Sequence, residues 1–569
     1  SMKNMVKLTV ASATYLVKEL GDRGCAMAGD KCIILGTCSK ATKLVQSKLI
    51  KEGIRIKVGE AGKDLGLDTT VAKVRKTAAF KARLWKGRVK AKKLKSLVRQ
   101  VKEVGSLFNA AIKTVALYGH QAKGITPSVM RSYRANLIQT IGLYKKGGCT
   151  TTTIALHLGT KKDPWYVVVM ETIDTWLDLA PQLAMQNLAL DITWQKARQR
   201  LLHPFTRWRR VVGPIHNLIA VLLHLGWDPV QPWEWKSPEG TTWKLDPRSH
   251  LLKHQIREQV LKHFELLLWK QASTHLHGKG MELGADISGG KKHVKYLKGH
   301  GRYGEAGMLA TIIKAGIWTP ERVAAGRRPP CPTPNCPKCH KIGGATWAHQ
   351  VWECPWTISQ TDPRIQATNQ HLNLGLEGSE VLPCLWLRGI VPHSWTTGRV
   401  LEYTQQHEDC QIQLGGAFLA GRLNLPEGAT AGTDGSGGQM SSDPRCRKVG
   451  WGVIVLDQDL NPIAWASGGA KGDQTVPRAE LSALCWLAQH TDGDIEVAID
   501  AKYVIRGFRK GPMGIHEYHL DLWEQLWAHM QARQGTISTT WIKSHLSIES
   551  AYNLEFPAWA YAANQIADV

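Results

Sequence analysis

The last quarter of the chain alternates short apolar runs with longer segments that carry one apolar face. Four runs rich in β-branched and aromatic residues are typical of strands: 449–455, 463–466, 495–500 and 537–542. Leucine recurs at helical spacing from Pro477 to Gln489, and further helices are predicted around Tyr503 and from Leu520 to Trp527. If the apolar run that ends at Asp434 is the first strand, the pattern predicts one mixed sheet with strands and helices in the order βββαβαβα.

Helical periodicity dominates the middle of the chain. Apolar positions recur with a period near 3.6 in residues 201–227 and 251–272, so the range 141–325 is predicted to be mainly helical. Glycine and lysine crowd residues 278–304, which favours a loop or linker there. Residues 360–425 are predicted to form a connector with helical pieces.

Size and charge narrow the classes of function. The chain has 569 residues, enough for three or more domains. A formal net charge of +26 predicts a polyanionic partner, namely RNA, DNA or an RNA–DNA hybrid. The most apolar run, Leu218 to Leu225, is short and contains His224, so it predicts a buried helix and no membrane partner.

One segment concentrates the positive charge. Between Lys73 and Lys102 there is no acid, and apolar residues interleave the basic ones at spacings that mostly suit a helix. A solvated helix face normally mixes charge signs, whereas an unbalanced cationic helix repels itself unless phosphates neutralise it. The segment therefore predicts a nucleic-acid-binding surface made of Lys73, Arg75, Lys76, Lys81, Arg83, Lys86, Arg88, Lys90, Lys92, Lys93, Lys95, Arg99 and Lys102.

Four acidic residues stand at the ends of predicted strands or in predicted helices: Asp434, Glu480, Asp500 and Asp568. A buried carboxylate is costly unless it is paired or holds a metal. Converging carboxylates suit two Mg²⁺ or Mn²⁺ ions about 4 Å apart, an arrangement that supports in-line attack on a phosphodiester.

In these four acids and in the order of its predicted strands and helices, the segment 426–569 resembles ribonuclease H. The resemblance implies that the four acids hold two magnesium ions and that the enzyme cleaves RNA in an RNA–DNA hybrid. Residues 541–545 resemble the family loop whose histidine helps proton transfer and product release, which implies that role for His545. Family members continue the last helix for several turns, whereas Asp568 is followed only by Val569, so we expect Asp568 at a frayed helix end.

A second cluster has the spacing of metal ligands. Cys336, Cys339, His349 and Cys354 follow the pattern C-x2-C-x9-H-x4-C, which suits one closed, structural, tetrahedral Zn²⁺ site. Because the segment is too short to form a hydrophobic core, a bound metal would supply its folding energy. Cys331 and His340 are alternative ligands. The piece from Thr346 to Cys354 resembles the zinc finger that follows the reverse transcriptase in retroelement polyproteins.

The first 140 residues resemble a reverse transcriptase from the late palm into the thumb. The resemblance is carried by 30–35, 44–53, 63–66, 116–119 and 130–131. A polymerase needs paired aspartates on a palm hairpin to bind two metals. The chain has no Asp-Asp pair, and only Asp22 and Asp30 precede Asp64, so we expect no polymerase activity from this polypeptide alone.

The order of these segments along the chain resembles the C-terminal half of a non-LTR retrotransposon polyprotein. The expected fold class is multidomain α/β with a ribonuclease H-like mixed sheet. The expected domains are a reverse transcriptase palm-end and thumb-like region (1–140), a mainly helical region with a Gly-rich linker (141–325), a CCHC zinc finger (326–360), a connector (361–425) and a ribonuclease H-like domain (426–569).

Two functions fit this organisation. One is a nuclease that cuts RNA in hybrids, and the other is a domesticated, non-catalytic RNA-binding scaffold among other subunits of a ribonucleoprotein. The four intact carboxylates favour the nuclease. Eight of the twelve cysteines show no pairing pattern, which indicates a reducing intracellular compartment, the nucleus first and an organellar ribonucleoprotein second.

Overall fold

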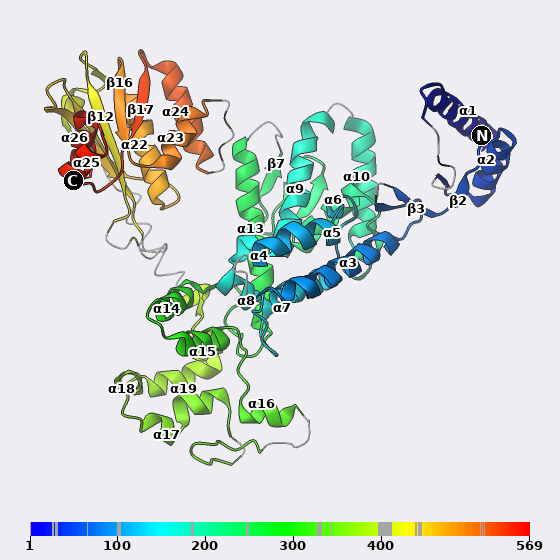
Figure 1. Cartoon of the computed structure of the whole chain (residues 1–569), viewed down its shortest axis with the longest axis horizontal. Helices are drawn as coiled ribbons and strands as arrows, with labels where there is room; N and C mark the ends of the chain where they lie inside the picture. Colours follow the sequence, from blue (N-terminus) through cyan, green and yellow to red (C-terminus); the bar gives the residue numbers. More distant parts are fainter. Residues whose placement is uncertain are drawn as a thin grey trace. The chain divides into compact units, whose positions relative to one another are not determined.

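The chain folds into two compact units (Figure 1). One comprises Ser1–Arg248 and Ile256–His393, and the other Ser249–Gln255 and Ser394–Val569. The computed structural model describes residues 2–25, 28, 32–64, 66–98, 104–183, 187–245, 250–326, 333–342, 344–395, 412–438, 441, 447–512, 514, 516 and 518–568. Within these ranges, no helix has both the length and the apolar composition that crossing a bilayer requires.

The first unit begins with a small α/β element. Helices α1 (Met2–Asp22) and α2 (Ser39–Lys51) pack through Val6, Val45 and Leu49, beside the parallel pair β1 (Ile33–Leu35) and β2 (Lys57–Gly59). A hairpin of β3 (Ala61–Asp64) and β4 (Leu67–Thr70) follows. Of the segments that carry the reverse transcriptase resemblance, 30–35 contains β1 and 44–53 overlaps the end of α2, while Asp30, Lys31 and Leu65 lie outside the described residues.

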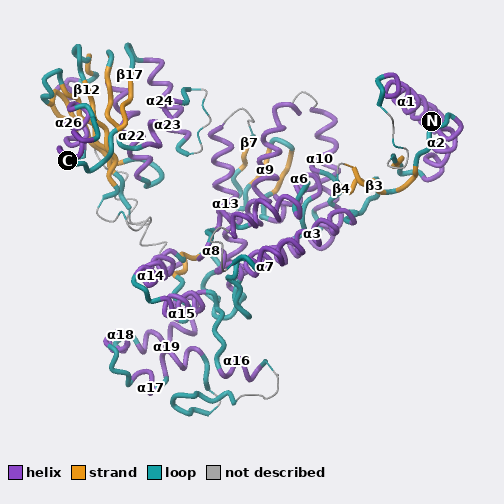
Figure 2. Tube along the Cα trace, in the orientation of Figure 1, coloured by secondary structure: helices purple, strands orange, loops and turns teal. Residues whose placement is uncertain are grey.

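The middle of the chain is mainly helical, as predicted (Figure 2). Its main helices are α3 (Ala78–Lys95), α7 (Pro127–Thr140), α8 (Thr150–His157), α9 (Pro164–Leu183), α10 (Asn187–Leu201), α12 (Pro214–His224) and α13 (His250–Ser273). The predicted helical stretch 201–227 is interrupted, because Pro204 and Pro214 each start a new helix. The small sheet of β5 (Asp228–Gln231), β6 (Glu234–Lys236) and β7 (Thr242–Lys244) was not predicted.

The loop predicted for residues 278–304 is wrong for much of its length. The range contains α14 (Ser288–Gly299) and the start of α15 (Tyr303–Ile313). Val294 and Leu297 of α14 are buried. Gly290 serves close packing, because a Cβ there would lie 2.7 Å from Ile313 Cδ1. The glycines that suggested a linker therefore belong to a packed helix pair.

Short helices surround the segment predicted as a zinc finger. They are α16 (Pro320–Ala325), η6 (His349–Glu353), α17 (Pro355–Ile358), α18 (Pro363–Asn369), α19 (Leu372–Val381) and α20 (Pro383–Trp386). The chain then returns to α14, since β9 (Val391–Pro392) pairs with β8 (Ala285–Asp286), two residues before that helix.

The second unit is a six-stranded mixed sheet in the order β10-β14-β13-β12-β16-β17. Its strands are β10 (Gln413–Gly416), β12 (Thr430–Ser436), β13 (Gly450–Leu456), β14 (Pro462–Gly469), β16 (Ile495–Ile499) and β17 (Ile537–Trp541). Its main helices are α22 (Val476–His490), α23 (Lys502–Arg509), α24 (Leu520–Ala532) and α26 (Ala558–Ala567). The predicted order βββαβαβα is confirmed, and β10, from the range predicted as a connector, adds an edge strand beside β14.

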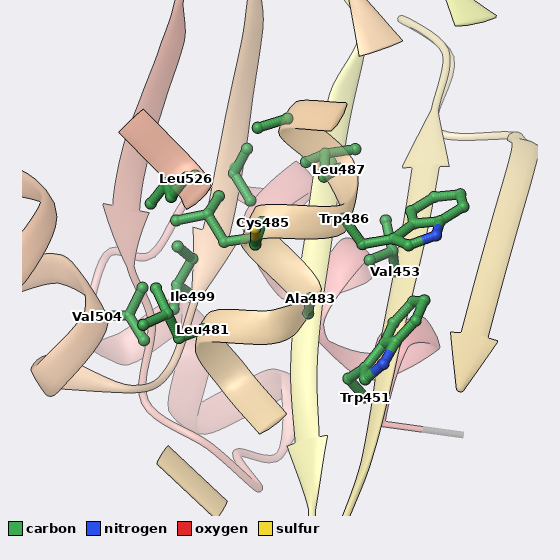
Figure 3. Packing of buried hydrophobic residues seen from close by; sticks show 14 of the residues in the cluster. Trp451, Val453, Leu481, Ala483, Cys485, Trp486, Leu487, Ile499, Val504 and Leu526 are labelled. Carbon is green, nitrogen blue, oxygen red and sulfur yellow. The ribbon is translucent and has the colours of Figure 1, made fainter. Parts of the chain in front are cut away.

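Both faces of the central strands are buried, because alternate residues enter two different cores. Val453 and Val455 pack under α22, where Figure 3 shows Leu481 and Trp486 among sheet residues. Ile454 and Leu456 pack under α26 with Ala560 and Ala563. This period-2 alternation holds β12 and β13 between two helical layers.

Candidate active site and metal centres

Parallel pairing brings two of the predicted acids to one edge of the sheet. In the register of β12 and β16, Thr433 lies opposite Ile499; Asp434 is the next residue of β12, and Asp500 is the first residue after β16. Glu480 lies near the start of α22, which packs on β12. One carboxylate oxygen from each of the three residues lies within 4.8 Å of the other two. The structure thus brings together three of the four predicted acids.

A glycine permits this convergence. A Cβ on Gly435 would lie 2.7 Å from the Glu480 backbone nitrogen and 3.0 Å from its Cδ. Arg478 lies two residues before Glu480 on α22. It links α22 to α24 by donating to both carboxylate oxygens of Asp521, at 2.9 and 2.5 Å. Sequence reasoning missed both residues, although their neighbours Asp434 and Glu480 were identified.

The site is electrostatically strained when its acids are ionised. Burial, then the charges of Asp500 and Asp434, raises the pKa of Glu480 to about 10. Burial, then the charges of Asp500 and Asp568, raises the pKa of Asp434 to about 6. The pKa of Asp500 is also raised, mainly by burial. Neutralising this cluster requires either protons or cations.

The donor set fits divalent cations. All three donors are carboxylates, the hard oxygen ligands that Mg²⁺ and Mn²⁺ prefer. Glu480 is 4% exposed, and within the described part of the chain its Oε2 has no hydrogen-bond partner. A divalent cation would satisfy such a buried carboxylate oxygen.

Asp568 and His545 stand beside this cluster as a pair. His545 Nδ1 lies 3.3 Å from Asp568 Oδ2, and the imidazole side chain is 78% exposed. Asp568 follows the last residue of α26, and its N–H donates to Asn564 O at 3.2 Å. Asp568 is outside the three-carboxylate group, although its charge acts on Asp434 and Asp500.

The chain is similar to a ribonuclease H domain. The similar structure is the N-terminal RNase H domain of rv2228c from Mycobacterium tuberculosis, solved as a fusion with maltose-binding protein. The match covers 25% of this chain and 96% of that chain, with 19% identity and a TM-score of 0.18. Neither a protein-family model nor a curated protein matches the chain. The chemistry of the second unit therefore follows from its own residues alone.

The four predicted zinc ligands also converge. Ligand atoms of Cys336, Cys339, His349 and Cys354 all lie within 4.8 Å of one another, with His349 Nε2 3.2 Å from Cys339 Sγ. His340, an alternative ligand in the sequence, is not in this group. Cys331 lies outside the described residues.

Neighbouring groups prepare this Cys3His cluster for a cation. Burial disfavours the Cys336 thiolate, but the N–H groups of Cys339 and Lys338 hydrogen-bond to it, and its pKa is lowered to about 6. On the other side of the imidazole, His349 Nδ1 lies 3.4 Å from Glu353 Oε2, which also accepts from Lys341 Nζ at 3.2 Å. A carboxylate at Nδ1 directs Nε2 toward a metal. The i,i+4 spacing of His349 and Glu353 was a signal for this contact that sequence reasoning did not use.

The predicted basic surface divides into two groups of residues. Arginines support the fold: Arg75 donates to Gly124 O, Arg83 to Gly66 O, and Arg88 to Ser132 Oγ. The lysines of α3 are exposed: Lys81, Lys86, Lys90, Lys92, Lys93 and Lys95. Lys73 and Lys76 are also exposed, and Arg99 and Lys102 lie outside the described residues.

Removing one acid should stabilise the metal-free protein. Since the pKa of Asp434 is raised, the folded state favours its protonated form, and stability is lost as pH rises from about 4, where the unfolded acid ionises, to about 6. In a buffer with a magnesium chelator that spares zinc, Asp434→Asn should therefore raise the free energy of unfolding on the order of 1 kcal/mol near neutral pH. Thermal unfolding at several pH values measures this gain, which should shrink below about pH 4.

Asp457→Asn is the matched control. The backbone N–H of Asn461 holds the pKa of Asp457 below its usual range, so its removal should give no gain. A wild-type midpoint equal to or above that of Asp434→Asn would contradict the strained-cluster interpretation.

Proposed function

We propose that the C-terminal unit is a ribonuclease H that cleaves the RNA strand of RNA–DNA hybrids with two divalent cations. The observation that carries this proposal is the convergence of Asp434, Glu480 and Asp500 from β12, α22 and the end of β16. The three residues would hold Mg²⁺ or Mn²⁺, with Asp568 beside them. Bound ions of this kind supply an activated water and stabilise the leaving 3′ oxygen.

The protein's own groups add proton transfer and orientation. Asp568 Oδ2 lies 3.3 Å from His545 Nδ1 and would orient the ring so that Nε2 faces away from Asp568. An exposed imidazole can exchange protons with solvent and pass one toward the departing strand. Selection of RNA would rest on its 2′-OH and on the shape of the hybrid.

The purified chain should cut the RNA strand of a labelled hybrid in Mg²⁺ or Mn²⁺. Asp434→Asn or Glu480→Gln should lower the rate by more than about 100-fold, since changes in residues that merely support metal ligands cost about 10- to 100-fold. His545→Ala should cost less, because solvent can partly replace a proton carrier.

Asp457→Asn, at a partly exposed acid of the same unit, is the control and should keep full activity. A folded chain that cuts no faster than Asp434→Asn would refute the nuclease and favour a non-catalytic, RNA-binding scaffold.

We also propose that the Cys3His cluster holds one structural Zn²⁺. The thiolates and imidazole would fill all four tetrahedral positions, which excludes an open catalytic site. Trp347 Nε1 donates to Leu387 O at 2.9 Å, so the ordered segment is attached to the helices that follow it.

Metal analysis should find about one zinc per chain. Cys339→Ser should remove it and speed proteolysis of residues 333–358, because metal supplies folding energy here. His340→Ala should keep the zinc, since that ring is outside the cluster. Zinc retained in Cys339→Ser, or lost in His340→Ala, would contradict the ligand set.

The third proposal is that the exposed lysines of α3 bind phosphates. Lys63, Lys76 and Lys86 line a groove of about 890 Å³ between the β3–β4 hairpin and α3. Trp85, 65% exposed, lies one turn after Lys81 on the helix surface and could contact a base.

Replacing Lys90, Lys92, Lys93 and Lys95 with Gln should weaken binding to duplex DNA. The slope of log K against log salt should flatten by as much as roughly 3 to 4 units, at about 0.9 per phosphate. Hybrid cleavage at saturating substrate should be unchanged. The charge-matched control replaces four other exposed lysines of the same unit with Gln: Lys51, Lys161, Lys162 and Lys236. An unchanged slope would place α3 away from nucleic acid.

A further inference from the structure

Lys314 is a buried lysine where helices α8, α14 and α15 pack together. It directly follows α15 and is only 5% exposed. Its carbonyl accepts from the N–H of Cys149, the residue before α8, at 2.7 Å. Burial, then the charges of Lys145 and Lys298, lowers the pKa of Lys314 to about 8. A buried ammonium group is costly unless an anion pairs with it.

Three exposed lysines lie near Lys314 on two other parts of the first unit. Lys291 and Lys298 lie two turns apart on one side of α14. Lys145 lies in the loop before α8, and a Cβ on Gly316 would lie 3.1 Å from Lys145 Cβ. This loop therefore packs against the segment that follows Lys314. Together, Lys145, Lys291, Lys298 and Lys314 form the lysine cluster.

The imidazole of His157 belongs to the same surroundings. His157 is the last residue of α8. Burial, then the charges of Lys314, Lys298 and Lys291, lowers its pKa to about 4, so the ring is neutral near pH 7. Its Nε2 is buried and has no hydrogen-bond partner within the described residues. In the tautomer that carries the proton on Nε2, this nitrogen can donate to an anion.

The lysine cluster has no counterion in the part of the chain that the structure describes. None of its four members forms an ion pair there. The three segments that carry them contain no acid: 104–162, 287–304 and 306–320. Asp163, the first acid after His157, pairs with the buried Arg134 at 2.8 Å. Four cations from three segments therefore converge without an acid to neutralise them.

We propose that the lysine cluster is a phosphate-binding site at the junction of α8, α14 and α15, and that it takes the backbone of a nucleic-acid strand. One phosphate would reach Lys314, with His157 Nε2 as a further donor. The exposed lysines would contact the neighbouring phosphates. The site uses none of the lysines of α3 and none of the carboxylates of the second unit.

Lysines without a free arginine favour phosphate over the carboxylates of an acidic protein segment. Arginine binds a carboxylate through two parallel hydrogen bonds, whereas lysine presents a point charge that suits phosphate. The neighbouring Arg322 donates to the carbonyls of Ala315 and Ile317, at 3.1 and 2.6 Å, so it supports the fold. The oxygens of one phosphate can accept from several ammonium groups at once.

Removing the buried charge should stabilise the full chain when no anion is bound. Lys314→Met keeps an apolar stem and removes an ammonium whose cost is present below about pH 8. In phosphate-free buffer near neutral pH, the variant should unfold at a higher temperature than the wild type. Lys196→Met, at an exposed lysine of the same unit, should leave the midpoint unchanged. A Lys314→Met midpoint at or below that of the wild type would overturn the proposal, because the ammonium would then be satisfied without an anion.

Inorganic phosphate tests the shared chemistry. At equal ionic strength, phosphate should slow amide hydrogen exchange in residues 145–157 and 306–316 of the wild type more than chloride does. Lys145→Gln/Lys298→Gln should lose this protection. The matched variant Lys196→Gln/Lys244→Gln, at two exposed lysines elsewhere in the unit, should keep it.

Three results of the exchange experiment would overturn the proposal. They are a wild type that phosphate does not protect, a loss of protection that is equal in both double variants, and a hexaglutamate peptide that protects as well as phosphate. The last result would identify an acidic protein segment as the ligand.

A fluorescent oligo(U) RNA of about 20 nucleotides distinguishes a strand from free phosphate compounds. Lys145→Gln/Lys298→Gln should weaken binding and flatten the slope of log K against log salt by up to roughly 1.4 units, at about 0.7 per phosphate of a single strand. Lys196→Gln/Lys244→Gln should keep the wild-type slope.

The two readouts together identify the source of the phosphate. An unchanged slope with lost phosphate protection would show that the site takes free phosphate compounds. An unchanged slope with unchanged protection would overturn the site. Neither result depends on hybrid cleavage, since oligo(U) is no substrate for a hybrid-specific nuclease.

Discussion

The fold of the second unit depends on how closely two helices can approach the central strands of its sheet. Gly435 of β12 gives room to α22, and Gly432 of the same strand gives room to α26, because a Cβ there would lie 2.2 Å from Ala563 O. On β13, a Cβ on Gly452 would lie 2.9 Å from Ala567 O. Three glycines therefore set the positions of the helices that carry Glu480 and Asp568. A larger side chain at any of these three glycines would push a helix away from the sheet and so increase the distance between the acids.

The close approach of the helices also brings the carboxylates together, and the packing of the rest of the unit offsets their repulsion. Carboxylates brought together in a partly buried site repel one another, and burial removes the water that would screen them. The two cores on either side of the sheet, with the Arg478–Asp521 pair between α22 and α24, hold the helices against that repulsion. Local destabilisation at a site supported by a well-packed scaffold is common where ligands must bind.

Much of this arrangement was predictable from the sequence, for identifiable physical reasons. The strands and helices of the second unit have strong period-2 and 3.6-residue patterns, and the Cys3His ligands have a characteristic spacing. Strand β10 was missed because Gln413-Leu414-Gly415-Gly416 has no β-branched residue and pairs only at an edge. Helix α14 was missed because its glycines suggested a loop, whereas Gly290 serves packing against Ile313, which only the tertiary fold reveals. The division of the cationic run into supporting arginines and exposed lysines likewise depends on carbonyl and hydroxyl partners distant in sequence.

The Cys3His segment is continuous with the helices around it and shares their contacts. Trp352 Nε1 donates to Trp386 O at 3.2 Å, and Gly375 lies against the Trp352 ring. Cys384 and Ile390, just beyond, enter the core that also contains Val294 and Leu297 of α14. The segment is thus not a detachable cassette. Replacing it with a metal-binding segment of another protein would remove the indole contacts, so the segment and its supporting helices must change together.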